Sequence, residues 1–547
     1  MNAPASPLWS DGSTAVIHTG TWRSATPVHR DRPSPCHQAC PVGGRIAEWI
    51  GQLRDGDVEG AWRTLVDNNP FPAIAGRICH HPCEGSCNRA GLDGAVSICR
   101  LERAVGDRAL EAGWRLPGPG RASSAKVAVI GGGPAGLSAA YQLRRRGHAV
   151  TLYEAQPALG GLMRYGIPRY RLAADVLDGE IDRILEIGVE ARTGMPVDAE
   201  TFATLRASCD AVYVATGAAR PKRLPALDYD QPWVLDSSAY LAETNAGDTP
   251  DLGRRVTVIG GGSAAMDVAR AALRHGREVT VLALEKENQL PAQREELDEA
   301  LEEGIALRTG AMLRSVTTRD DGALTLHCVH VDFRPGPERG RFTVQPVADG
   351  EFDLVTDAVV PAIGQEIDLG PLGLDAAGAP LAVDETFRTE LGNVWAGGDV
   401  ASLDRFVTAA VGMGKAAAAA IDRALDGNAG EAGEPAPPAG ATPLAAINAH
   451  YHPRDGRAPA ARRPAAERVA SFAEVQLALD ADAALREAGR CFSCGTCIHC
   501  DNCYLYCPDM AVLKENGGYA IRTEYCKGCG LCVKECPTGA VQMRAGR

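Results

Sequence analysis

Cysteines near the end of the chain form the most specific pattern in the sequence. The motif Cys-x2-Cys-x2-Cys-x3-Cys-Pro occurs twice, and the second copy begins 29 positions after the first. Three thiolates at this spacing can hold one corner of a [4Fe–4S] cluster, while the cysteine before proline binds the other cluster of a two-cluster module. The predicted ligands are Cys497, Cys500, Cys503 and Cys536 for one cluster, and Cys526, Cys529, Cys532 and Cys507 for the other. Two zinc sites are the alternative, although zinc more usually binds paired Cys-x2-Cys knuckles.

A glycine-rich loop between a predicted strand and a predicted helix indicates a dinucleotide site. Its residues are Gly131, Gly133, Pro134, Ala135 and Gly136. The glycines allow a tight turn, a close approach of pyrophosphate and packing of the helix on the sheet, and the helix N-terminus attracts the phosphates. Glu154 ends the next predicted strand, where an acid should accept a hydrogen bond from a ribose hydroxyl.

A second loop repeats this pattern with Gly260, Gly262, Ser263 and Ala265. Alanine replaces the third glycine, which is a tolerated form. Glu285 follows the next predicted strand, in the place of the ribose acid. Two such sites suggest one bound flavin and one exchangeable nicotinamide nucleotide. The alternative is that the second unit is only structural.

Two strand–helix–strand units, at 126–155 and 254–285, must position these loops. Strands that alternate with helices predict a mostly parallel, doubly wound sheet. Residues 24–118 contain apolar residues at helical spacing around further cysteines. The predicted fold class is therefore α/β, with two Rossmann-like doubly wound nucleotide-binding domains, an N-terminal helical iron–sulfur domain and a C-terminal bacterial-ferredoxin-like α+β domain.

Charge and cysteine usage exclude several classes of protein. Asp and Glu outnumber Lys and Arg by 69 to 56, which disfavours binding to nucleic acid or anionic membranes through phosphate contacts. No apolar stretch reaches the ~20 residues of a membrane span, and no export signal is visible at the start. Clustered cysteines in a large chain indicate metal rather than disulfides. We therefore expect a cytoplasmic protein that binds neither nucleic acid nor membrane.

Segments spread over residues 30–425 resemble the small subunit of glutamate synthase and its stand-alone relatives. These relatives include the iron–sulfur half of dihydropyrimidine dehydrogenase and the larger subunit of NADH-dependent ferredoxin:NADP oxidoreductase. The likeness is carried by ACPVGGRIAEWI (39–50), NNPFPAIAGRICHHPCEGSC (68–87), VAVIGGGPAGLSAA (127–140), EAQPALGGLMRYGIPRYRL (154–172), VATGA (214–218), VIGGGSAAMDVAR (258–270), PAIGQ (361–365) and WAGGDV (395–400). So many matches in order make the likeness specific.

The resemblance implies roles for particular residues. The first unit would bind FAD through its loop and Glu154, and the second would bind the nicotinamide nucleotide. Further residues expected at the FAD are Gly161, Leu162, Arg164, Gly217, Gly398 and Asp399. The expected ligands of a [4Fe–4S] cluster near the flavin are Cys40, Cys79, Cys83 and Cys87. No catalytic side chain is expected, because the cofactors carry the chemistry.

The expected domains follow from the motifs and the resemblance together. They are 1–124 for the helical [4Fe–4S] domain, 125–252 and 359–426 for two parts of the FAD-binding domain, 253–358 for the NAD(P)H-binding domain, 427–485 for a linker that begins with a Pro-, Ala- and Gly-rich segment, and 486–547 for the 2[4Fe–4S] domain.

The chain departs from its relatives in its N-terminal cysteines. Relatives carry a Cys-x2-Cys pair upstream of the position of Cys36, and here no cysteine precedes Cys36. Cys491 and Cys494 supply a spare pair near the other end of the chain. Setting aside Cys209 and Cys328 leaves sixteen cysteines, four for each of four clusters. A fourth cluster could use Cys36, Cys491 and Cys494 with either Cys99 or Glu102; the alternative is that these are ordinary buried thiols.

A second departure concerns the nucleotide. Relatives that use NADPH place two arginines after the second strand, where this chain has Ala283-Leu284-Glu285. An acid there should repel a 2′-phosphate, which favours NADH over NADPH. Arg277 and Lys286 lie near in sequence and could weaken this argument, and Glu285 could instead be a solvated surface charge.

These features predict an enzyme that passes electrons between NADH, FAD and three to four [4Fe–4S] clusters. The expected partner is a ferredoxin or an iron–sulfur subunit of a larger complex, such as a 2-oxoacid or aldehyde oxidoreductase, in a hetero-oligomer. The alternatives are the glutamate synthase small subunit itself and a non-catalytic iron–sulfur scaffold. The appended cysteine-rich domain argues against the former, and the two intact glycine loops argue against the latter.

Overall fold

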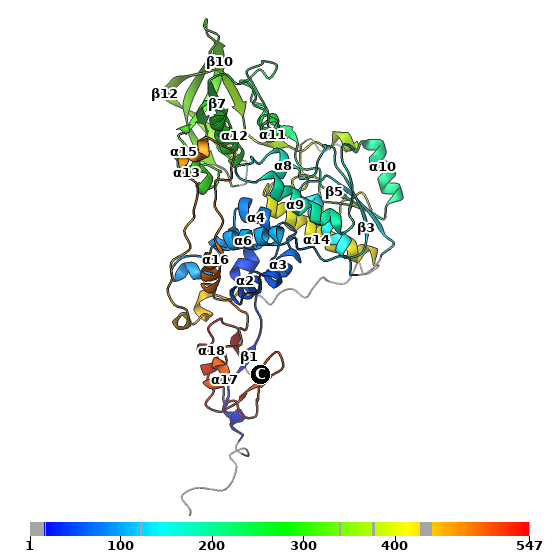
Figure 1. Ribbon diagram of the computed structural model, residues 1–547, viewed down its shortest axis with the longest axis vertical. Helices are drawn as coiled ribbons and strands as arrows, with labels where there is room; N and C mark the ends of the chain where they lie inside the picture. The colour runs from blue at the N-terminus through cyan, green and yellow to red at the C-terminus, as the bar shows by residue number, and fades with distance from the viewer. Residues whose placement is uncertain are drawn as a thin grey trace, which may run out of the picture.

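The computed structural model describes residues 16, 18–120, 123–337, 341–374, 378–426 and 440–545. Figure 1 shows a central group of N-terminal helices, an α/β domain on the right, a second α/β domain at the top and a cysteine-rich module at the bottom. The Pro-rich start of the predicted linker, 427–439, lies outside the described residues.

The larger α/β domain is a five-stranded parallel sheet in the order β15-β5-β2-β3-β4. The strands are β2 (Lys126–Ile130), β3 (Ala149–Tyr153), β4 (Glu190–Arg192), β5 (Ala211–Val214) and β15 (Val394–Ala396). Its helices are α7 (Pro134–Arg145), α8 (Leu162–Tyr165), α9 (Ala174–Glu186), α10 (Ala199–Ser208), α11 (Ser237–Ala246) and α14 (Val407–Leu425). The strand order reverses between β2 and β5, and such a reversal is where doubly wound sheets bind ligands.

The second α/β domain repeats this topology in the order β13-β7-β8-β9, also parallel. Its elements are β7 (Arg255–Ile259), α12 (Ser263–Arg274), β8 (Glu278–Leu282), η4 (Glu287–Gln289), α13 (Arg294–Glu302), β9 (Ala306–Arg308) and β13 (Ala358–Pro361). An antiparallel sheet of β10 (Ala311–Thr318), β11 (Leu324–Pro335) and β12 (Phe342–Thr356) is added to it. The two nucleotide-binding folds predicted from the glycine loops are confirmed, and so is the α/β fold class. A small antiparallel pair, β6 (Arg220–Pro221) and β14 (Gln365–Glu366), lies between the two domains along the chain, and η5 (Gly370–Leu372) follows it.

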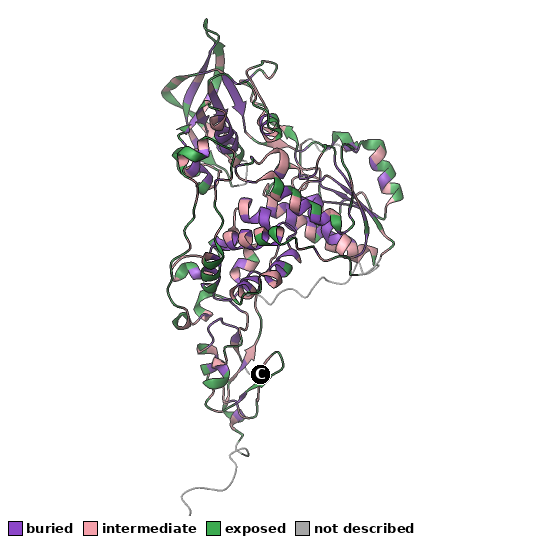
Figure 2. Cartoon of the chain, viewed as in Figure 1, coloured by how far each residue is buried: buried purple, intermediate pink, exposed green. Residues whose placement is uncertain are grey.

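Short helices at the N-terminus form one core with the larger α/β domain. They are α1 (Pro35–Ala39), α2 (Ile46–Arg54), α3 (Val58–Val66), α4 (Pro72–Ile78), α5 (Pro82–Gly85), η3 (Asn88–Gly91) and α6 (Ile98–Glu111). Trp49 and Trp62 are almost completely buried here, and Figure 2 shows these helices largely in the colours of buried and intermediate residues. The buried Tyr141 of α7 donates a hydrogen bond to the carbonyl of Val66, which joins the helices to the sheet domain.

The cysteine-rich module contains segments from both ends of the chain. Its elements are η2 (Thr19–Trp22), β1 (Ala25–His29), α17 (Asn502–Leu505), β16 (Val512–Glu515), β17 (Gly518–Ile521), α18 (Leu531–Lys534) and β18 (Val541–Ala545). Strand β1 pairs antiparallel with β18, from Ala25 opposite Ala545 to His29 opposite Val541. The expected division at 486–547 did not include this N-terminal strand.

Residues 440–485 are held along the surface of the other domains, as the orange and brown trace on the left of Figure 1 shows. They include η6 (Leu444–Ala446), η7 (Ala449–Tyr451) and α15 (Ala465–Val469), and α16 (Ala481–Gly489) follows. Arg468 of α15 bonds Glu302 of α13 at 2.7 Å, and Gln476 donates to Glu299. This part of the predicted linker therefore has defined contacts with the second α/β domain.

Candidate functional site

The first glycine loop turns sharply between β2 and α7. Gly131 has φ +109°, and a Cβ there would lie 2.3 Å from the carbonyl oxygen of Ala215, just after β5. A Cβ on Gly136 would lie 1.9 Å from the carbonyl oxygen of Gly131. At Gly133 a Cβ would meet no atom nearer than 3.9 Å, on Gly161. Two of the glycines are therefore required by the fold, whereas Gly133 keeps open a space that the protein does not fill.

Glu154 holds the loop from the end of β3. Its carboxylate accepts hydrogen bonds from the backbone N–H of Gly132 at 2.7 Å and of Gln156 at 2.8 Å. It also lines the cavity beside the loop. Gly161 follows with φ +52°, where a Cβ would lie 2.8 Å from the Cα of Gly133. Glu154 thus fixes the conformation of the turn, and its carboxylate lies where a ribose would bind.

A cavity of about 410 Å³ opens at this switch point of the sheet. The predicted residues that line it are Gly131, Gly133, Pro134, Ala135, Glu154, Gly161, Leu162, Gly217, Gly398 and Asp399. Two polar atoms of lining residues, Thr216 Oγ1 and Arg405 Nε, are buried and have no hydrogen-bond partner in the described structure. A cavity with glycines at the phosphate position, unpaired polar atoms and an acid at the ribose position fits FAD.

Some predicted residues lie elsewhere, and some lining residues were missed. Gly136 lies behind the loop, and Arg164 bonds Asp178 and the carbonyl of Leu159 and is not among the lining residues. Arg405 and Gln365 line the cavity and bond one another through the Gln365 carbonyl at 2.5 Å. Gln365 belongs to the PAIGQ segment, so its sequence signal was present; Arg405 carries no motif.

The second loop repeats the turn of the first. Gly260 has φ +145°, and a Cβ there would lie 2.4 Å from the carbonyl oxygen of Ala362, just after β13. A Cβ on Gly261 would lie 2.7 Å from Glu285 Oε2, as one on Gly132 would lie 2.9 Å from Glu154 Oε2. The Gly262 position is open, with no atom within 4 Å of an added Cβ. Ser263 begins α12, and the buried Ala265 packs against the loop.

The two cations near Glu285 in sequence, Arg277 and Lys286, do not pair with its carboxylate. Burial raises the pKa of Glu285. Arg277 precedes β8, so it lies at the far end of α12, a helix about 18 Å long at 1.5 Å per residue. Lys286 is exposed and pairs with Asp332 at 3.4 Å. Neither cation is therefore held at the Glu285 carboxylate.

Helix α14 joins the FAD cavity to the N-terminal cysteines. Phe406 and Val407 line the cavity, and the next residue, Thr408, accepts a hydrogen bond from Cys79 Sγ at 3.5 Å. The Phe406 ring also stacks on His80, with ring centroids 3.9 Å apart. Three consecutive residues, Phe406, Val407 and Thr408, thus connect the flavin position with a cysteine predicted to bind iron.

Cys79 belongs to a group that includes Cys40, Cys83 and Glu102. Burial raises the pKa of all three thiols, and the Glu102 carboxylate raises each further. Glu102 is itself fully buried, which raises its pKa to about 7, and it accepts a hydrogen bond from Asn69 at 2.9 Å. Glu102 is therefore a neighbour of Cys40, Cys79 and Cys83, whereas Cys87 lines a cavity with Cys36, Cys491 and Cys494.

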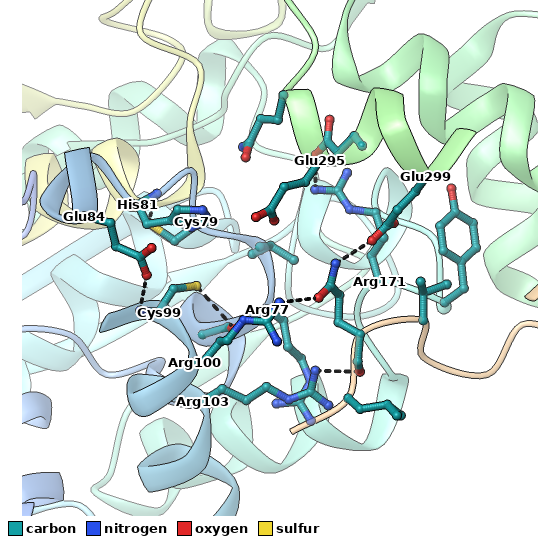
Figure 3. Close-up of a pocket in the computed structure, with 18 of the residues that line it drawn as sticks. Arg77, Cys79, His81, Glu84, Cys99, Arg100, Arg103, Arg171, Glu295 and Glu299 are labelled. Atoms are coloured by element: carbon teal, nitrogen blue, oxygen red, sulfur yellow. Dashed lines mark hydrogen bonds and ion pairs between the residues drawn. The ribbon is translucent and has the colours of Figure 1, made fainter. Parts of the chain in front are cut away.

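Cys99 lies in a different environment from Cys36. Its thiol donates to the carbonyl of Gly76 at 3.4 Å, and its backbone N–H donates to Glu84 at 2.9 Å. Figure 3 shows Cys99 and Cys79 on one side of a polar pocket whose other walls carry Arg171 and Glu299. Cys99 Sγ thus faces the carbonyls of Ala75 and Gly76, and Cys99 does not line the cavity that holds Cys36, Cys491 and Cys494.

The eight C-terminal motif cysteines separate into the two predicted sets. Cys507, Cys526, Cys529 and Cys532 line one cavity of about 20 Å³. Burial raises the pKa of Cys503 to about 12, and Cys497, Cys500 and Cys536 are among the neighbours that raise it further. Among the described residues, no three His, Cys, Asp or Glu side chains lie close enough to hold a single ion. Four-iron clusters space their thiolates more widely than one ion does, so this finding is compatible with [4Fe–4S] clusters, to which the motif spacing points.

Comparisons with known proteins agree with these sites. A family model described as pyridine nucleotide-disulphide oxidoreductase matches residues 125–420. A model of dihydropyrimidine dehydrogenase domain II, 4Fe-4S cluster, matches residues 29–114, and a 4Fe-4S binding domain matches residues 519–542. The fold and sites define an FAD-dependent NAD(P)H oxidoreductase with iron–sulfur domains, an electron-transfer subunit. The chain belongs to the pyridine nucleotide-disulphide oxidoreductase family.

Three curated relatives illustrate the range of this family. NADP(+)-dependent formate dehydrogenase subunit beta of Moorella thermoacetica is 34% identical over 84% of this chain and 70% of its own length. NAD-dependent dihydropyrimidine dehydrogenase subunit PreT of Escherichia coli K12 is 32% identical over 72% of this chain and 92% of its own length. The glutamate synthase [NADPH] small chain of the same organism is 30% identical over 71% of this chain and 87% of its own length. Of two further relatives the chain spans 48%. These matches confirm the resemblance drawn from the sequence motifs.

None of the helices in the described ranges is long and apolar enough to cross a membrane.

Proposed function

We propose that this chain is an NADH:acceptor oxidoreductase, in which electrons pass between NADH, FAD and iron–sulfur clusters to or from a redox partner. FAD, when bound, can exchange two electrons with the nicotinamide nucleotide and single electrons with clusters. The observation that carries the proposal is the contact chain at the start of α14. Phe406 and Val407 line the FAD cavity, and Thr408 contacts Cys79.

The protein's own part is to position these groups and exclude water from between them. Thr408 and Cys79 are buried or half-buried, and Gly412 of α14 packs directly on the carbonyl of Pro41, next to Cys40. Lys415 of the same helix donates to the carbonyl of Val42 at 2.8 Å. We infer that Cys40, Cys79, Cys83 and Glu102 hold the cluster nearest the flavin.

NADH is the proposed nucleotide. Glu285 stands at the second loop as Glu154 stands at the first, and its charge would repel a 2′-phosphate. The relatives do not decide this point, since one is named NADP(+)-dependent and another NAD-dependent.

An iron–sulfur protein is the proposed partner. The module with α17 and α18, whose segments carry the doubled cysteine motif, lies at the bottom of Figure 1, away from the two α/β domains. Cys500 and Cys529 are exposed there, together with Leu505 and Met510. The relatives named above are subunits by name, and we propose that this chain too works within a hetero-oligomer.

Anaerobic addition of NADH to purified protein tests the proposal. The flavin absorbance should bleach, and oxidised 2[4Fe–4S] ferredoxin or a one-electron dye should then sustain turnover. Protein that binds FAD but shows no bleaching with NADH or NADPH would overturn it.

A further inference from the structure

Four cysteines from the two ends of the chain line one small cavity under the N-terminal helices. They are Cys36, Cys87, Cys491 and Cys494. The rest of the wall is largely apolar and includes Ile46, Ile50 and Phe492. Its volume, about 20 Å³, equals that of the cavity lined by four cysteines of the doubled motif. By this measure the two cavities are alike in size and in thiol content.

The Cys491–Cys494 loop shares a left-handed residue with the loops of the doubled motif. The residue two positions after Cys491 is Ser493, with φ +49°. His499 and Gly528 occupy the same position after Cys497 and Cys526, with φ +53° and +71°. A left-handed conformation is costly for a residue other than glycine. Ser493 therefore adopts a strained conformation that matches loops with a ligand motif.

Hydrogen bonds to sulfur follow the same pattern. The backbone N–H of Ser493 donates to Cys491 Sγ at 3.4 Å. Burial raises the pKa of Cys497 and Cys526, and backbone hydrogen bonds from His499 and Gly528 oppose this effect. Such bonds stabilise a thiolate and tune a cluster that it binds. Cys494 also accepts a hydrogen bond from Asn88, next to Cys87, at 3.4 Å.

Buried hydrogen bonds and ion pairs hold the Cys491–Cys494 loop against the N-terminal helices. Arg89 donates to the carbonyl of Arg490 at 2.8 Å and lies 4.9 Å above the Phe492 ring. Arg490 bonds Glu487 at 2.6 Å and Asp93 at 3.1 Å. The loop is therefore placed by contacts that do not depend on a metal.

We propose that these four cysteines bind a fourth [4Fe–4S] cluster, so that a Cys-x2-Cys pair from the C-terminal end replaces the pair missing from the N-terminus. Cys87 completes the set in place of Cys99, because Cys87 lines the cavity with the other three whereas Cys99 Sγ lies against the carbonyl of Gly76. The cluster would lie between the Cys79 group and the ferredoxin-like module, because Cys87 follows Cys83 on the chain and Cys494 precedes Cys497. It would pass single electrons between them, and in that role it rests on the proposed function.

Metal analysis of anaerobically purified full-length protein tests the proposal without any variant. Four cubane clusters predict about 16 iron and 16 acid-labile sulfide per chain. Full chemical reduction should give electron paramagnetic resonance spins for four clusters. About 12 iron, spins for three clusters or stoichiometric zinc would each overturn the proposal. These readings do not involve NADH, so they are independent of whether the proposed function holds.

Paired variants identify the ligands. The double substitution Cys491→Ser with Cys494→Ser, and separately Cys87→Ser, should each lower the iron content by about four per chain with FAD retained. Cys99→Ser is the matched control and should keep the full iron content. Unchanged iron in the double variant, or a loss in Cys99→Ser equal to that in Cys87→Ser, would contradict the ligand set.

Discussion

At the scale of single residues, the two glycine loops separate positions that the fold needs from positions that a ligand needs. At Gly131, Gly136 and Gly260 an added Cβ would collide with backbone. At Gly133 and Gly262 it would meet open space, and φ is −79° and −90° there, which any residue can adopt. Substitutions at the open positions therefore test ligand binding without disturbing the loop.

Gly133→Val should release FAD while the protein stays folded. A side chain in the path of the pyrophosphate should cost about 1–3 kcal/mol, roughly ten- to hundredfold in affinity. Gly262→Val is the matched control: it should retain FAD and raise the KM for NADH by a similar factor. The measurements are the flavin-to-protein ratio and steady-state kinetics. Full flavin in Gly133→Val would show that FAD is bound elsewhere.

Glu285 should decide the choice of nucleotide. We expect a higher kcat/KM for NADH than for NADPH in dye reduction. Glu285→Gln should lower the ratio of kcat/KM for NADH to kcat/KM for NADPH by about tenfold. Lys286→Gln, at the neighbouring exposed residue, should leave it within about twofold. A wild-type preference for NADPH would refute the role given to Glu285.

The same residue predicts a pH dependence. Because burial raises the pKa of Glu285, its carboxylate gains a proton at a higher pH than an ordinary glutamate. Repulsion of the 2′-phosphate should therefore weaken as the pH falls, and the NADH preference of the wild type should fall with it. The phosphate also titrates, so the comparison is with Glu285→Gln, whose ratio should change less over the same range.

At the scale of elements, α14 is the helix that connects the larger α/β domain to the N-terminal helices around Cys40 and Cys79. One face packs on α7, where a Cβ on Gly414 would lie 2.3 Å from the carbonyl of Ala135. Another packs on the N-terminal segment, where a Cβ on Gly412 would lie 2.2 Å from the carbonyl of Pro41. The sequence shows these glycines only as interruptions of an apolar run, because nothing local tells which backbone approaches them.

Gly412→Ala should destabilise the protein, although alanine favours helix by about 1 kcal/mol. The collision with Pro41 should cost about 1–3 kcal/mol and lower the first thermal transition. Gly51→Ala in α2 is the matched control, since an added Cβ there has no neighbour within 4 Å; it should raise stability instead. Equal effects in the two variants would argue against close packing of α14 on the cysteine domain.

At the scale of the whole molecule, sequence patterns predicted mainly what is local, together with one link between distant segments, that of Cys36 with Cys491 and Cys494. The βαβ units and the doubled cysteine motif are set by short spacings, so their loops and helices could be predicted. The pairing of β1 with β18 joins residues more than 500 positions apart and has no local signal. Cys87 lines a cavity with Cys36 and is not grouped with its sequence neighbour Cys83. This grouping depends on how α5 and η3 are placed, which the spacing of the cysteines in the sequence does not show.

We propose that electrons move between the nicotinamide nucleotide and the clusters through FAD. The direct measurement starts with protein whose clusters have been reduced chemically and separated from the reductant. On anaerobic mixing with NAD+, the visible cluster absorbance should recover as NADH forms in stoichiometric amount, and Gly133→Val, reduced in the same way, should retain its electrons. Clusters that stay reduced in the wild type, or reoxidise equally fast without flavin, would contradict the account.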